Sequence, residues 1–197
     1  MAEFASKTVY FNQTGPDNTE RTLEIARARM VELGLRTVMV ASTQGVTGAR
    51  AAEVYKGFDV IVVSHSTGFD VPNTQQMTPE NRKVIEARRA RILTCVHAFG
   101  GVNRAVRKQF DTMELDEIIA HTLRIFGQGV KVIAEMSLMA ADAGLVRTDT
   151  PVMGIAGTSN GADTAAIVLP TNAQTFFDLK FLEIVCWPSP NHPTFAR

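Results

Sequence analysis

The chain has 197 residues, with 20 basic and 20 acidic side chains, and its formal net charge at pH 7 is zero. This length suits one domain with a full hydrophobic core, so we expect a single domain over residues 1–197. The balanced charge gives no reason to expect nucleic acid or a membrane surface as a partner. The two cysteines, Cys95 and Cys186, lie in apolar runs, and the first residues lack the apolar core of a secretion signal. These features predict buried thiols in a cytoplasmic protein.

The first half of the chain alternates apolar strands with helical segments. Strands are predicted at residues 8–12, 37–41 and 59–64, and the last is an unbroken β-branched run. Asp17 and Glu20 have the spacing of a capping box, so we expect a helix to begin at Asp17. This order of elements predicts an α/β fold built on a parallel sheet.

Helix ends in this half are marked by residues with known preferences. Gly34 is expected to end the first helix, and a short second helix is expected to end near Gly57. Thr78 and Pro79 are a typical capping residue and a first-turn proline, so a third helix is expected to start there.

The second half of the chain contains four further apolar segments. Strands are predicted at residues 92–96, 151–156, 164–169 and 179–187. The last of these is interpreted either as pairing with a second copy of the chain across a two-fold axis or as buried within one copy.

Two more helices are predicted in this half, at residues 115–126 and 130–143, separated by Gly127 and Gly129. Residues 130–143 are rich in alanine and methionine, which favours a central buried helix. Glu135 and Asp142 are expected on a solvent-exposed flank of it; in the alternative, a carboxylate buried there would need a partner, such as Lys131 for Glu135.

Residues 41–48 combine hydroxyl groups with glycines at the end of a strand and before a helix. A phosphate group needs several convergent N–H and O–H donors, a backbone without Cβ obstruction and the positive end of a helix dipole. The same residue types are common in ordinary turns. From these eight residues alone, a phosphate site and a polar turn are equally good interpretations, and no standard nucleotide-binding motif is present.

Four loops follow predicted strands, and in parallel sheets ligands gather at this edge. His65 and His97 each come directly after such a strand, so both rings could reach one pocket as donors, acceptors or general bases. The alternative is that each ring only bonds a neighbouring loop carbonyl. No metal site is predicted, since no third ligand stands at a telling spacing. The four loops are residues 42–48, 65–77, 97–101 and 157–163.

Two other segments carry polar groups. Residues 157–163 are rich in small donors and could hold an anion, a ribityl chain or a ring edge, or could form a tight connection in which Asp163 bonds its own loop. Arg104, Arg107, Lys108 and Phe110 form a basic patch. We interpret that patch as a solvated surface, and no helix or strand is predicted within residues 97–111.

Several motifs taken together resemble one family. They are Ser-Thr-x-Gly-x-Thr-Gly at 42–48, His-x-x-Gly-Phe at 65–69, Met-Ala-Ala-Asp-Ala-Gly at 139–144 and Gly-Ala-Asp-Thr at 161–164. They resemble stand-alone proteins similar to the C-terminal α/β domain of pyruvate kinase. The resemblance implies a three-layer αβα sandwich with a mostly parallel sheet over nearly the whole chain.

The resemblance also implies a ligand. In the pyruvate kinase domain the loop matching 42–47 holds a phosphate of an allosteric sugar bisphosphate, and the stand-alone family is associated with flavin mononucleotide (FMN). The resemblance assigns phosphate contacts to the loop at 42–48, contacts with the ring of the ligand to residues within 65–69, and further ligand contacts to the loop at 157–163. These residues are Ser42, Thr43, Gln44, Gly45, Thr47 and Gly48, then His65, Gly68 and Phe69, then Gly157, Thr158, Gly161, Ala162 and Asp163.

Three functional hypotheses follow. The first is FMN binding, which would support a flavin-dependent redox reaction. The second is a non-catalytic sugar-phosphate sensor or assembly module. The third is a lyase or hydrolase that uses His65 and His97. Pyruvate kinase activity is not expected, because phosphoryl transfer belongs to a barrel domain for which this chain has neither the length nor the motifs.

Overall fold

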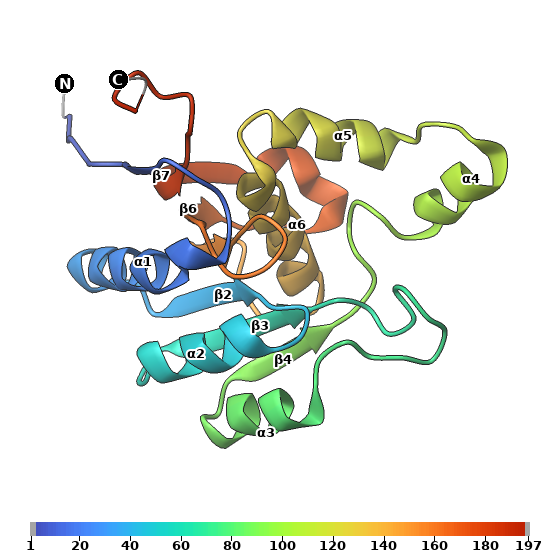
Figure 1. Cartoon of the computed structure of the whole chain (residues 1–197), viewed down its shortest axis with the longest axis horizontal. Helices are drawn as coiled ribbons and strands as arrows, with labels where there is room; N and C mark the ends of the chain where they lie inside the picture. The colour runs from blue at the N-terminus through green and yellow to red at the C-terminus, as the bar shows by residue number, and fades with distance from the viewer. Residues whose placement is uncertain (1–2, 196–197) are drawn as a thin grey trace.

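The computed structural model describes residues 3–195 as an α/β fold around one sheet of seven strands. The strand order is β1-β7-β6-β5-β2-β3-β4, and Figure 1 labels β7, β6, β2, β3 and β4 of this sheet. The strands are β1 (Val9–Phe11), β2 (Thr37–Ala41), β3 (Asp59–Ser64), β4 (Arg91–Thr94), β5 (Val152–Ala156), β6 (Thr164–Leu169) and β7 (Lys180–Pro188).

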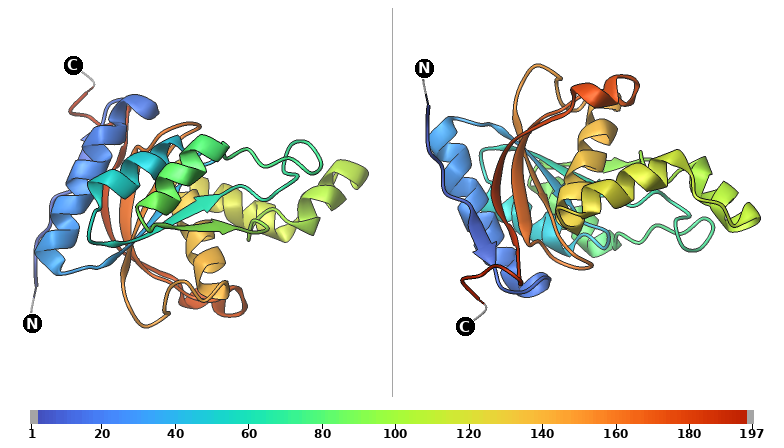
Figure 2. Two further views of the ribbon diagram at one scale, coloured as in Figure 1. Left: turned by 90° about the horizontal axis from the view of Figure 1, so that it is seen from below. Right: turned by 90° about the horizontal axis from the view of Figure 1, so that it is seen from above.

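Helices cover both faces of the sheet, which makes a three-layer sandwich (Figure 2). One face carries α1 (Thr19–Leu33), α2 (Val46–Val54) and α3 (Pro79–Ala87). The other face carries α6 (Gln128–Asp142), against which α5 (Leu115–Arg124) and the 3-10 helix η2 (Ala173–Asp178) pack. A shorter 3-10 helix, η1 (Pro16–Asn18), precedes α1, and α4 (Val102–Phe110) projects from the body.

The sheet is mostly parallel. The pairs β1/β7, β2/β3, β2/β5 and β3/β4 are parallel, while β6 runs antiparallel to both β5 and β7. The connection from β5 to β6 is residues 157–163, which is too short for the crossover that a parallel pair requires.

Alternate residues of the central strands form two separate cores. In β2, Val38 and Val40 pack on the face of α1 and α2, whereas Met39 packs on the face of α6. This is the period-two alternation of a strand buried on both sides. The approach of α6 to the sheet is close, because a Cβ on Gly154 would lie 2.5 Å from Cγ2 of Ile133.

Several predicted boundaries are wrong. Helix α1 begins at Thr19, after η1, and no side chain caps its N-terminus, so Asp17 and Glu20 form no capping box. Helix α6 begins at Gln128 and includes Gly129, which was predicted to separate two helices. Strand β4 ends at Thr94.

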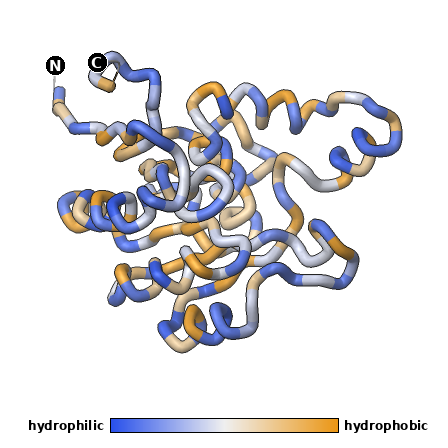
Figure 3. Tube along the Cα trace, viewed as in Figure 1, coloured by the Kyte–Doolittle hydropathy of each residue, from blue (hydrophilic) through white to orange (hydrophobic). Residues whose placement is uncertain are grey.

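Helix α4 lies where no element was predicted. It buries none of its residues, and polar residues are interspersed with apolar ones along α4 and α5 (Figure 3). Within residues 3–195, no helix combines the length and the apolar character that crossing a membrane would require.

Candidate functional site

A cleft of about 800 Å³ opens at the carboxyl ends of β2, β3 and β5. Its walls come from the loops after these three strands and from residues of α1, α2, α4, α5 and α6. All four predicted strand-end loops therefore contribute to one cavity. The loop after β4 does so through His97.

The loop between β2 and α2 has a backbone that is open to a ligand. The Ser42 hydroxyl oxygen accepts a hydrogen bond from the Gly48 amide at 2.9 Å, which satisfies one donor of the first turn of α2. Within residues 3–195, the five amides from Thr43 to Thr47 have no protein acceptor. A run of free amides at the positive end of a helix is the arrangement that binds phosphate in many proteins.

Two glycines of this loop have structural roles and do not line the cleft. Gly45 adopts φ +94°, which favours glycine, and a Cβ there would lie 2.6 Å from Cβ of Asn81. A Cβ on Gly48 would lie 2.5 Å from Cγ1 of Val62, so Gly48 allows α2 to pack closely on β3.

A chain of side-chain hydrogen bonds orients His65. Gln76 donates its amide to the Asp70 carboxylate, so its oxygen accepts from Nδ1 of His65 at 2.7 Å. In the neutral ring, this leaves Nε2 of His65 to accept from the Thr43 hydroxyl at 3.3 Å. His65 therefore bonds two side chains, not a loop carbonyl as one interpretation of the sequence held.

The side-chain rings of His65, Phe69 and His97, from the loops after β3 and β4, contact one another. The ring centroids of His65 and Phe69 are 4.2 Å apart, and the rings of Phe69 and His97 stack at 4.9 Å. The guanidinium of Arg104 lies over the Phe69 ring, 4.5 Å from its centroid. The interpretation of Arg104 as part of a solvated patch is wrong, because Arg104 is half-buried and lines the cleft.

Burial controls the charge of His97. Desolvation lowers the pKa of His97 to about 4, and the positive charges of Lys131 and Arg104 act in the same direction, against Glu135. The imidazole is therefore neutral at pH 7 and can donate or accept a hydrogen bond in the cleft.

Glu135 is not on an exposed flank of α6, so that expectation is wrong. It is buried, and its carboxylate accepts from Nζ of Lys131 at 2.5 Å and from the Phe99 amide at 3.0 Å. Burial lowers the pKa of Lys131, against the opposing effect of Glu135. Asp142 is exposed, as expected, and accepts from Asn172 and the Ala173 amide.

The loop between β5 and β6 is organised by Asp163, which is fully buried. Its carboxylate accepts from the amides of Gly15 and Thr158, at 3.0 and 3.1 Å, and from the Thr164 hydroxyl at 2.8 Å. A Cβ on Gly157 would lie 2.7 Å from the Gly161 carbonyl oxygen, so the loop needs glycine there. Asp163 thus shapes this wall of the cleft from behind.

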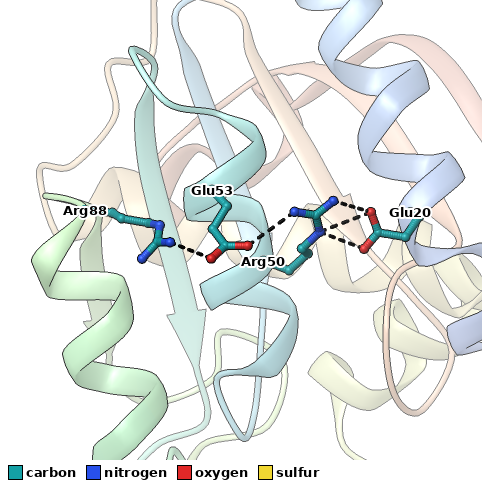
Figure 4. A network of polar contacts seen from close by, with 4 residues as sticks. All are labelled: Glu20, Arg50, Glu53 and Arg88. Carbon is teal, nitrogen blue, oxygen red and sulfur yellow. Dashed lines mark hydrogen bonds and ion pairs between the residues drawn. The ribbon is translucent and has the colours of Figure 1, made fainter.

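A surface network joins the three helices on one side of the cleft (Figure 4). Arg50 of α2 bonds Glu20 of α1 at 2.7 Å and Glu53 at 3.2 Å, and Glu53 in turn bonds Arg88 at 2.5 Å. The hydrogen bond from Arg50 lowers the pKa of Glu20. Since the Arg50 charge is already matched by carboxylates, the free amides are the main anion-directed feature of this wall.

The predicted site residues divide into two groups. Those that line the cleft are Ser42, Thr43, Gln44, Thr47, His65, Phe69, Gly157 and Gly161. Those that do not line it are Gly45, Gly48, Gly68, Thr158, Ala162 and Asp163. Most of the second group shape the loops, as their contacts above indicate.

Sequence reasoning did not place several cleft residues. They are Glu20, Arg50, Arg104, Arg124, Gln128, Lys131 and Glu135, all on helices. For Lys131 and Glu135 a signal existed, since their spacing puts both on one helix face.

A search of known protein families finds no family that this chain matches. Within residues 3–195, no three His, Cys, Asp or Glu side chains gather in a group that could hold a metal ion.

Proposed function

We propose that the cleft binds a phosphorylated ligand, FMN in the first place, with its phosphate on the amides of residues 43–47. The observation that carries the proposal is the run of five amides without a protein acceptor in residues 3–195, beside the cleft. A phosphate would accept from these amides and interact favourably with the α2 dipole. Thr47, which also lines the cleft, carries a hydroxyl donor.

The dimensions and walls of the cleft suit the rest of FMN. A cavity of about 800 Å³ lies within the range of small-molecule sites. His65, Phe69 and His97 offer ring surfaces beside the Thr43 loop, since Thr43 and His65 are 3.3 Å apart. A flat ring system has aromatic partners there, and the ribityl hydroxyls have polar neighbours in Ser159 and Asn160.

The resemblance to the stand-alone proteins similar to the pyruvate kinase C-terminal domain supports the same ligand. The α/β fold fits that resemblance. Bound FMN would supply hydride-transfer or one-electron chemistry. The residues of this chain would hold the phosphate, enclose the ring and present the neutral His97 to it.

The test is a titration of FMN followed by its visible spectrum and fluorescence. Wild-type protein is expected to bind FMN, and Thr43→Val is expected to weaken binding by about tenfold, because the hydrogen bond that holds His65 beside the loop is lost. Thr148→Val is the matched control, since Thr148 is exposed and away from the cleft. Absence of a bound yellow species, or equal affinity in Thr43→Val and wild type, would refute the proposal.

The second candidate is a non-catalytic sugar-phosphate sensor or assembly module. The amides of residues 43–47 recognise a phosphate and not the group attached to it, which favours this alternative for the same loop. A thermal-shift competition separates the two, because the true ligand stabilises the fold at low concentration. If fructose 1,6-bisphosphate raises the melting temperature at concentrations where FMN does not, the second candidate replaces the first.

A further inference from the structure

Three helices contribute cationic side chains to the cleft away from the phosphate-binding loop. Arg104 comes from α4, Arg124 from α5 and Lys131 from α6. A cleft lined by charges of one sign raises the local concentration of ligands of the opposite sign.

These cations exceed the negative charge around them. Glu135 bonds Lys131 and is the one carboxylate in residues 3–195 that bonds or bridges any of the three. Arg124 donates to the neutral Gln128 side chain at 2.7 Å, and Arg104 covers Phe69 without an acceptor in the described residues. The donors of Arg104 and most of those of Arg124 therefore remain available.

The three cations line the same cleft. The charges of Arg124 and Arg104 both lower the pKa of Lys131, in addition to its desolvation. Lys131 is itself nearly buried, with 7% of its side chain exposed, and its ammonium has three donors but one bonded carboxylate. An ammonium in this position gains from an anion that enters the cleft.

The aromatic cluster connects Arg104 to the loop of residues 43–47. Thr43 contacts His65, His65 contacts Phe69, and Arg104 lies on the ring of Phe69. Arg104 thus lies on a different wall of the cleft from the amides, with the rings of His65 and Phe69 in the series of contacts between them.

We propose that Arg104, Arg124 and Lys131 form a second anion subsite, which binds the carboxylate or phosphate group of a small organic acid beside the first ligand. The proposal deepens the proposed function and rests on it, since it names the class of molecule that shares the cleft with the phosphorylated ligand. The guanidinium of Arg104 presents the planar fork that binds either oxyanion through two hydrogen bonds.

The test is calorimetric titration of sodium malonate, and separately of inorganic phosphate, into the protein saturated with FMN and into the protein alone. Arg104→Gln and Arg124→Gln are each expected to weaken binding of the preferred anion by about tenfold, because a charge-assisted contact is lost. Binding is also expected to weaken as sodium chloride is raised. The arm that gives the tighter binding to FMN-saturated protein identifies the group as carboxylate or phosphate.

Controls address folding and surface charge. Arg147→Gln removes an exposed arginine that bonds Asp149 outside the cleft, and it is expected to leave anion affinity unchanged. Because Lys131→Met alone would leave Glu135 buried without its partner, Lys131→Met is combined with Glu135→Gln, and this pair is also expected to weaken binding.

The outcomes separate the two proposals. If FMN binds but neither anion does, or if anion affinity is the same in wild type, Arg104→Gln and Arg124→Gln, the second subsite is refuted while the FMN proposal stands. If an anion binds and the variants weaken it, but FMN does not bind, the subsite is supported and the FMN proposal fails.

Discussion

Among single residues, His97 makes the stability of the folded protein depend on pH. Its folded pKa of about 4 lies below the ordinary value of 6.5, mainly through desolvation. Between these two values the unfolded chain binds the proton and the folded protein does not, so protonation favours unfolding. We expect stability to fall as pH drops through 6.5 towards 4. The measurement is the free energy of unfolding in urea across this range.

Substitution at His97 tests this prediction. In His97→Gln the contribution disappears, so the decrease in stability between pH 6.5 and pH 4 is expected to be shallower than in wild type. His121→Gln is the matched control, because His121 is exposed on α5. Identical pH profiles for His97→Gln and wild type would contradict the assignment.

Contacts between residues that are close in the sequence could be predicted, whereas contacts between distant segments could not. The spacing of Lys131 and Glu135 indicated a pair on one helix face, but their burial depends on α5 and the loop at Phe99, which come from other parts of the chain. The position of Arg104 on Phe69 joins helix α4 to the loop after β3, and no local pattern in the sequence predicts that contact. Local chemistry thus indicated the loop between β2 and α2, which lines the cleft, whereas the cationic wall needed the tertiary structure.

Among the elements, α6 packs on the sheet closely enough to require glycine at position 129. A Cβ on Gly129 would lie 2.2 Å from Oγ1 and 2.4 Å from Cβ of Thr164. Replacing glycine by alanine inside a helix ordinarily stabilises it by up to about 1 kcal/mol. Here we expect Gly129→Ala to destabilise the protein by about 1–3 kcal/mol, since α6 or β6 must shift. Unfolding in urea measures this change in free energy. If Gly129→Ala is more stable than wild type, α6 and Thr164 move apart without cost and the prediction is wrong.

The same contact explains one error in the predicted elements. Glycine lowers helix propensity, so Gly129 was interpreted as a break, but tertiary packing selects it. Strands β3 and β6 have the predicted bounds, because their apolar β-branched runs end at clear polar or glycine-rich loops. Helix α4 was missed although Val102, Val106 and Phe110 recur at helical spacing, because the segment was interpreted as a solvated basic patch after two glycines.

For the whole molecule, the order of strands decides which edges are free. The strand predicted at 179–187 was open to two interpretations, and β7 lies between β1 and β6 within one copy of the chain. The N-terminal strand β1 therefore covers an edge that would otherwise be exposed, and both ends of the described chain lie on that side (Figure 1).

Removal of residues 1–11 is expected to expose this edge of β7. Val9 and Phe11 pack against the larger core, the Thr8 hydroxyl donates to the Ile184 carbonyl at 2.9 Å, and the Ser189 amide donates to the Phe11 carbonyl at 2.8 Å. Loss of this burial and hydrogen bonding is expected to cost about 2–4 kcal/mol of unfolding free energy. An uncovered strand edge also pairs readily with other chains, so light scattering should rise with protein concentration. A control that removes only residues 1–5 keeps β1 and should behave as wild type. If the chain without residues 1–11 has unchanged stability and does not associate, β1 contributes nothing to the stability of the sheet.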